Sequence, residues 1–194
     1  MDSGLEKLTE MKSTLQNYMN YIYSKYNSLT REVVFSGMVL KKTIDIVSVA
    51  EYTYKNKIIT VQISLLRLLC DNCLAIQSAL ELGLPMLMNV INENQRVNNL
   101  MIDEEQNMSD GYLKKLVSKS YPGFDKLYRF ASEGVHFSKQ AMSGAFNKND
   151  DGSINLNIKV GNPELKNELE SNNNSMITLC KVIIDMLKRL CEKK

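Results

Sequence analysis

The sequence predicts an all-α fold, a multi-helix bundle of five to seven helices with a small β-hairpin inserted before the last helix. Apolar residues recur every three to four positions over most of the chain, and only one short stretch alternates apolar with polar residues. At 194 residues, of which 44% are hydrophobic, the chain is long enough to bury a sizeable core. We therefore expect residues 1–194 to form a single helical-bundle domain.

The first two helices are predicted from apolar spacing and a capping residue. Residues 4–27 carry apolar side chains at three-to-four spacing, which is typical of an amphipathic helix. Thr30 is suited to cap a second helix, since a threonine hydroxyl can accept from the free N–H groups of a first turn. We expect that second helix to fray near residues 54–57, before a third begins.

The third helix, residues 57–81, is predicted to be central because apolar side chains surround most of its circumference. Its one polar stripe contains Arg67 and Asp71, which lie four residues apart and can form an ion pair. Three explanations fit the stripe: a strip of solvent, an internal ion pair that fixes helix register, or the wall of a polar cleft. The whole stripe comprises Thr60, Ser64, Arg67, Asp71 and Ser78.

The later elements are predicted from helix-breaking residues, helix-capping residues and one change in the spacing of apolar side chains. Gly83 and Pro85 separate the third helix from a fourth that is expected to reach Met101, and Ser109 is suited to cap a short helix. A further helix, opened by Pro122, is expected to run to about residue 142. Residues 154–160 alternate apolar and polar, which predicts a strand paired with residues 144–148. The last helix is expected from residue 162.

Composition and motifs exclude several classes of protein. A formal net charge of +2 lacks the basic footprint of a dedicated duplex-DNA binder, and no apolar run is long enough to predict a membrane span. We therefore expect a cytoplasmic protein without membrane contact. Phosphate-cradling glycine loops and the motifs of serine hydrolases and zinc proteases do not occur.

The sequence predicts neither a metal nor a cofactor. The four cysteines lie in helical segments, where buried thiols are the expected state of a reduced protein: Cys70, Cys73, Cys180 and Cys191. Residues 147–158 imitate a calcium-binding loop, but Asn147 and Ile158 stand where carboxylates are needed. We interpret this segment as the tip of the hairpin.

His136, the only histidine, is the one side chain with an ordinary pKa near neutrality. Helical projection places it on a polar side of its helix together with Arg129, Ser132 and Glu133. Such stripes are usually solvated. A base held by a carboxylate beside a guanidinium can, however, activate a hydroxyl and stabilise an oxyanion.

Arg129 and His136, separated by six residues on a late helix, resemble the R-x(4-6)-H motif of the HEPN superfamily of small helical bundles. The resemblance implies a metal-independent endoribonuclease, often dimeric, in which Arg129 and His136 are catalytic. Phe130 follows the arginine, where this superfamily usually carries a polar residue.

A second resemblance covers about half of the chain. The segments SLLRLLCDN at 64–72 and LYRFASEGVHFS at 127–138 are similar to bacterial helical families of unknown function with an L-L-R motif and a later L-Y-x-x-x-S-x-x-x-H-x-S motif. This resemblance implies a fold rather than an activity. It directs attention to Arg67, Ser132, His136 and Ser138.

These observations leave two functional hypotheses. The first is a noncatalytic binding or assembly module for an unidentified ligand or protein partner, with homodimerisation open. Its polar cleft would be formed by Arg67, Asp71, Ser132, Glu133, His136 and Ser138. The alternative is a HEPN-like endoribonuclease of a toxin or phage-defence type, which would bind RNA and use Arg129 and His136.

Overall fold

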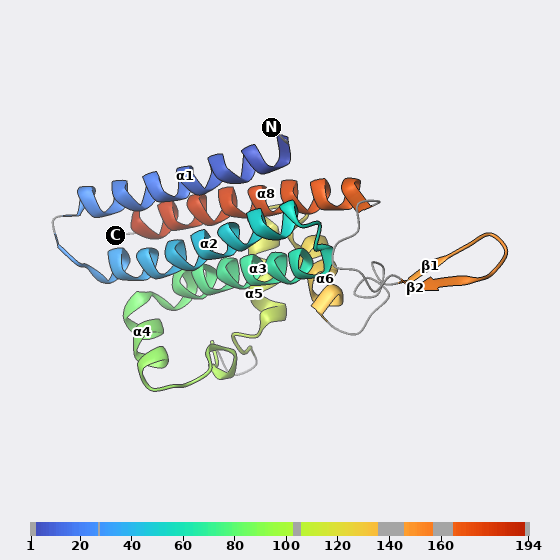
Figure 1. The fold of residues 1–194 in the computed structure, drawn as a ribbon. Coiled ribbons are helices and arrows are strands. Elements are labelled where there is room, and N and C mark those ends of the chain that lie inside the picture. Colours follow the sequence, from blue (N-terminus) through green and yellow to red (C-terminus); the bar gives the residue numbers. More distant parts are fainter. Residues whose placement is uncertain (1–2, 27, 103–105, 136–145, 157–164, 193–194) are drawn as a thin grey trace.

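Four long helices form the body of the molecule in a computed structural model (Figure 1). They are α1 (Ser3–Lys25), α2 (Arg31–Lys55), α3 (Ile59–Leu82) and α8 (Lys166–Glu192). The described residues are 3–26, 28–102, 106–135, 146–156 and 165–192. Consecutive pairs α1–α2, α2–α3, α3–α8 and α8–α1 are all in contact, so the four helices close into a ring. The predicted all-α class is therefore correct.

Helix α3 is the central element, as its apolar circumference predicts. It contacts α2 and α8 within the ring and also packs against three shorter helices, α4 (Leu84–Asn92), α5 (Asp110–Ser120) and α6 (Phe124–Val135). Among the described helices, α3 alone is long and apolar enough to span a membrane, but 61% of its apolar window is buried inside the bundle. That burial is what a core helix of a folded bundle shows.

The helix starts follow the capping residues that the sequence offers. The hydroxyl of Thr30 accepts from the backbone N–H of Val33 at the start of α2. In the same way the hydroxyl of Ser109 accepts from the N–H of Tyr112 at the start of α5. Both predicted caps are confirmed.

The fourth helix is shorter than predicted. Helix α4 ends at Asn92 instead of reaching Met101, and a 3-10 turn follows at Val97–Asn99. Asn94 adopts a left-handed backbone conformation with φ 54°, and its N–H bonds to the carbonyl of Ile91. Asparagine tolerates this conformation better than most residues, and it stops the helix.

Helices α3 and α6 run antiparallel and pack closely. Arg67 of α3 contacts Tyr128 of α6, while Ile63, one turn earlier on α3, faces Gly134, which is later on α6. A Cβ atom built on Gly134 would lie 1.9 Å from Cγ2 of Ile63. Only glycine therefore allows the two backbones to approach this closely.

Strands β1 (Phe146–Lys148) and β2 (Ile154–Leu156) pair antiparallel, with Phe146 opposite Leu156. Their turn contains Gly152 at φ 85°, a left-handed value that glycine adopts without strain. The predicted helical residues 136–142, the rest of the predicted hairpin and residues 162–164 lie outside the described residues.

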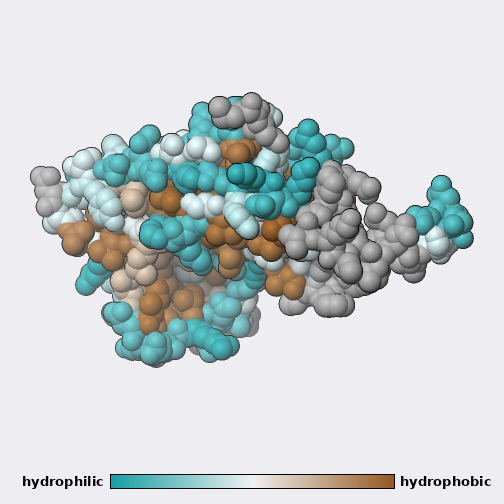
Figure 2. Space-filling view, in the orientation of Figure 1, coloured by the Kyte–Doolittle hydropathy of each residue, from teal (hydrophilic) through white to brown (hydrophobic). Residues whose placement is uncertain are grey.

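Polar side chains are buried in the ring as well, at positions that the predicted stripe did not include. Gln62 of α3 donates its amide to Oδ1 of Asn173 on α8 at 3.2 Å, and Asn72 donates to the hydroxyl of Thr43 on α2 at 3.1 Å. Buried amides joined by such hydrogen bonds are costly to separate and help to fix helix register. On the surface, Figure 2 shows separate apolar patches among hydrophilic side chains.

Candidate binding site: a polar cluster on α3 and the groove beside α6

Arg67 is the centre of a polar cluster that joins three helices. Its Nη1 forms an ion pair with Asp71 on the same helix, and its Nη2 donates to the hydroxyl of Tyr128 on α6 at 2.6 Å. Nη2 also lies 3.4 Å from Oδ2 of Asp110 on α5. The side chain of Arg67 is only 21% exposed. A guanidinium in such a position is tolerated because carboxylates and a hydroxyl compensate its desolvation.

Tyr128 holds α6 to this cluster through both its ring and its hydroxyl. The guanidinium carbon of Arg67 lies 4.2 Å from the ring centroid, a cation–π distance. The hydroxyl donates in turn to Oδ2 of Asp110 at 3.0 Å. Burial, together with the hydrogen bond to Asp110, raises the pKa of Tyr128 to about 12, although the charge of Arg67 opposes the shift. The phenol is therefore neutral at physiological pH and acts as a hydrogen-bond relay.

Asp110 connects the cluster to the segment before α5. It lies in the first turn of α5, where a carboxylate interacts favourably with the helix dipole. Its second oxygen accepts from the amide of Asn98 at 2.9 Å. Through Asp110, the 3-10 turn, α5, α6 and α3 are linked in one network.

A second ion-pair cluster lies along α5 and α6, nearer to solvent. Lys114 of α5 and Arg129 of α6 both contact Asp125, at 2.8 and 2.7 Å. The hydrogen bond from Lys114, aided by the charge of Arg129, lowers the pKa of Asp125 below its usual value. Arg129 is 68% exposed, so this pair is a surface contact.

The predicted cleft residues fall into three groups. Arg67 and Asp71 form the predicted ion pair, and Ser132 lies on α6 between the contacts of Tyr128 and Gly134 with α3. The hydroxyl of Ser132 is buried and has no hydrogen-bond partner among the described residues. Glu133 is exposed, as is Arg129, which was predicted to be catalytic rather than a cleft residue. The last two candidates, His136 and Ser138, lie outside the described residues.

The sequence prediction missed Tyr128 and Asp110 as members of the cluster. Tyr128 is not on the polar side that helical projection gives for this helix, and its side chain is buried. A tyrosine on a buried face needs a partner for its hydroxyl, and this requirement was a usable signal. Asp110 directly follows the capping Ser109, so its place at a helix start was visible, but its partner on α3 was not.

The buried thiols do not add a nucleophile to the site. Cys70, Cys73 and Cys180 are free and buried. Burial raises the pKa of Cys70 and of Cys180 to about 12. Because the thiolate is the reactive form, these cysteines are inert near neutral pH.

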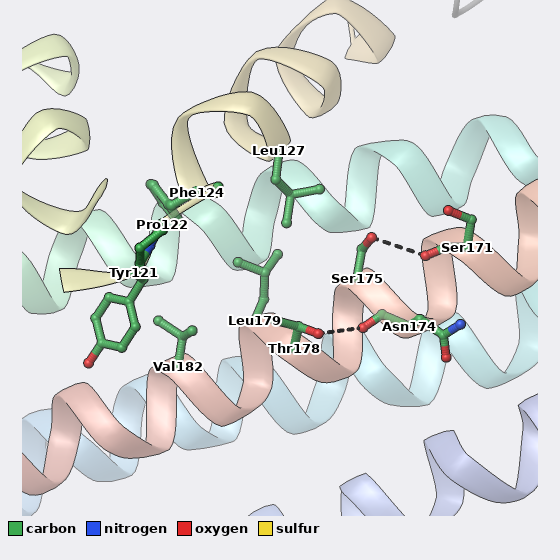
Figure 3. Close-up of a pocket in the computed structure, with 11 residues that line it drawn as sticks. Tyr121, Pro122, Phe124, Leu127, Ser171, Asn174, Ser175, Thr178, Leu179 and Val182 are labelled. Carbon is green, nitrogen blue, oxygen red and sulfur yellow. Dashed lines mark hydrogen bonds between the residues drawn. The ribbon is translucent and has the colours of Figure 1, made fainter. Parts of the chain in front are cut away.

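A groove of about 360 Å³ lies between α6 and α8 (Figure 3). Its apolar wall consists of side chains from both helices, namely Phe124, Leu127, Leu179 and Val182. Ser171, Asn174, Ser175 and Thr178 of α8 form a polar edge. The hydroxyls of Ser175 and Thr178 donate to carbonyls of their own helix, those of Ser171 and Asn174. Each hydroxyl oxygen keeps lone pairs that can still accept a hydrogen bond.

Comparisons of the chain with protein-family models, with curated proteins and with solved structures found no match. The Arg67 cluster combines one guanidinium with two carboxylates, so its cation is compensated within the fold. The groove is a recess with an apolar wall and a polar edge.

Proposed function

We propose that this chain is a noncatalytic binding module that holds a short segment of a protein partner in the groove between α6 and α8. The observation that carries the proposal is the engagement of Arg67 by Asp71, Tyr128 and Asp110. A guanidinium with three partners on three helices positions those helices. Because Nη1 and Nη2 are already engaged by two carboxylates and a hydroxyl, this guanidinium is poorly suited to bind a substrate anion.

The Arg67 cluster supports the groove indirectly. Tyr128 anchors α6 on α3, and Phe124, one turn earlier on the same side of α6, lines the groove together with Leu127. Holding α6 in place therefore fixes the distance between the groove's two walls. Preformed recesses of this kind bind with a smaller entropic cost than surfaces that must rearrange.

The chemistry of the groove indicates what the segment carries. The apolar wall suits one or two aliphatic or aromatic side chains, and the hydroxyl acceptors of α8 suit the N–H groups of an extended peptide. The groove contains no charged side chain among its lining residues. A short peptide with an apolar anchor and no charge at that anchor is therefore the partner that fits.

The ribonuclease hypothesis remains the second candidate, favoured by one observation. Arg129 is 68% exposed and could meet an RNA phosphate if it left Asp125. Its proposed catalytic partner, His136, lies outside the described residues. This hypothesis makes RNA, not a peptide, the ligand.

Two experiments separate these functions. Purified protein is incubated with several single-stranded RNAs without added metal, beside the Arg129→Ala variant. The binding proposal expects no cleavage by either protein. Cleavage by wild type that is lost in Arg129→Ala would establish the alternative.

The second experiment tests the groove itself. A displayed library of random peptides is selected against wild type, and the enriched peptides are titrated onto Val182→Lys and onto Tyr52→Lys. Tyr52 is 63% exposed on α2 and does not line the groove, so it is a matched control for added charge. We expect apolar-anchored peptides that lose binding to Val182→Lys alone. Equal binding to both variants would refute the groove as the site.

A further inference from the structure

A second cavity, of about 430 Å³, opens where the last turns of α1 meet the end of α8. It is separate from the groove beside α6 and shares no lining residue with it. The residues that give the cavity its chemistry are Tyr18, Tyr21, Lys25, Tyr26 and Lys188. Its volume lies within the range of about 300–1,000 Å³ that small-molecule sites occupy.

The aromatic side of this cavity is arranged for stacking. The rings of Tyr18 and Tyr21 are nearly parallel, with an interplanar angle of 21° and centroids 6.1 Å apart. Tyr21 is 52% exposed, so part of its ring is open to a ligand. Tyr26 is fixed by its hydroxyl, which donates to the carbonyl of Cys191 on α8 at 3.1 Å.

Two ammonium groups lie beside these rings. Nζ of Lys25 is 5.6 Å from the ring centroid of Tyr21 and 5.7 Å from that of Tyr26. Nζ of Lys188 is 5.8 Å from the ring centroid of Tyr18. In the part of the chain that the structure describes, neither lysine forms an ion pair with a carboxylate. Two positive charges and one negative charge, that of Glu192, line the cavity.

We infer that this tyrosine and lysine cavity binds a nucleoside monophosphate, with the base against the tyrosine rings and the phosphate between Lys25 and Lys188. Stacking on an aromatic side chain is available to every base. The two ammonium groups, neither of which forms an ion pair with a described carboxylate, can supply charge-assisted hydrogen bonds to a phosphate. The terminal carbonyls of α1 and α8 disfavour an anion at this end, so binding requires both lysines.

A simpler role for the lysines makes a different prediction. Lysine near a helix C-terminus stabilises the helix dipole wherever the side chain lies. That role needs neither a cavity nor rings within cation–π distance of both ammonium groups. Substitution of the lysines would then alter stability but not ligand affinity.

Isothermal titration calorimetry with adenosine 5′-monophosphate tests the inference on the full chain. We expect saturable binding with a Kd below about 1 mM, and adenosine or inorganic phosphate alone should bind at least about tenfold more weakly. Lys25→Met and Lys188→Met should each weaken binding by about tenfold or more, since each removes one charged contact. Tyr21→Ala should weaken it through lost stacking.

Lys181→Met is the matched control, because Lys181 is an exposed lysine of α8 that lines a different groove. It should leave the affinity unchanged. No binding by wild type at millimolar nucleotide would overturn the inference, as would an equal loss in Lys181→Met or equal affinity for phosphate alone. The same titration is made with a single-stranded oligoribonucleotide that carries the same terminal phosphate. Tighter binding of this oligomer would overturn the mononucleotide as the ligand and indicate the end of a nucleic acid instead.

Discussion

Substitution of Arg67 by methionine tests the interpretation of the polar cluster most directly. Methionine keeps much of the aliphatic bulk but removes the ion pair with Asp71, the hydrogen bond to Tyr128 and the cation–π contact. Removing one member of a fully buried pair costs about 3–5 kcal/mol, whereas an exposed pair contributes about 0–1 kcal/mol. Arg67 is 21% exposed and Asp71 is 38% exposed, so the loss should lie between these limits, near 2 kcal/mol.

For a domain of this length, about 2 kcal/mol corresponds to a decrease in Tm of about 4–8 °C. Urea unfolding followed by far-UV circular dichroism measures the free energy, and a thermal scan checks the Tm. Arg129→Met is the control, since Arg129 is 68% exposed and should contribute less than about 1 kcal/mol. If the two variants lose the same stability, the Arg67 cluster does not hold the helices together and the argument for α6 as a positioned wall fails.

The remaining predictions concern the packing and the ionisation of the core. Gly134→Ala should destabilise the fold by about 1–3 kcal/mol, because the added Cβ would overlap Ile63. Ile63→Ala in the same chain should recover part of that loss. A double-mutant cycle measured by urea unfolding tests this coupling. Asn173→Ala should lower the free energy of unfolding by about 1–3 kcal/mol, because it leaves the amide of Gln62 without a partner. Gln62→Leu in the same chain should then cause a smaller further loss than it causes alone. Additive losses of stability would contradict the pairing. The pKa of Tyr128 rises from 10.0 to about 12 on folding, so its contribution is complete below about pH 10 and is lost as the pH rises from 10 to 12. Tyr128→Phe should flatten that alkaline decline in unfolding free energy, and an unchanged slope would exclude the phenol as its source.

Local sequence rules were sufficient for the helix starts and for one ion pair. Thr30 and Ser109 cap helices because a short hydroxyl side chain satisfies N–H groups only a few residues away. Arg67 and Asp71 pair because four residues span one helical turn. Both partners of each contact lie within a few residues of one another, so the local sequence is enough to predict the contact.

The end of α4 depended on a preference too weak to predict from composition. No glycine or proline interrupts residues 86–101, so the apolar spacing alone favoured one long helix. The left-handed conformation of Asn94 ends it, and asparagine adopts that conformation only in some contexts.

The membership of the polar cluster depended on contacts between distant segments. Periodicity shows which side of a helix is buried but not which helix covers it. Tyr128 meets Arg67 and Asp110 because α5 and α6 both pack on the same part of α3. Periodicity separates this tyrosine from the polar side of its helix, whereas its partners depend on the three-dimensional arrangement.

The late position of α8 in the chain has a consequence for biosynthesis. The side of α3 that α8 covers emerges from the ribosome long before residue 166 is made, and at about 5–20 residues per second the delay lasts several seconds. During that interval the side of α3 that α8 later covers stays exposed, on a helix that is long and apolar enough to resemble a membrane span. A nascent chain of this kind is a natural client for a chaperone, and chains truncated before α8 should accumulate as insoluble aggregates.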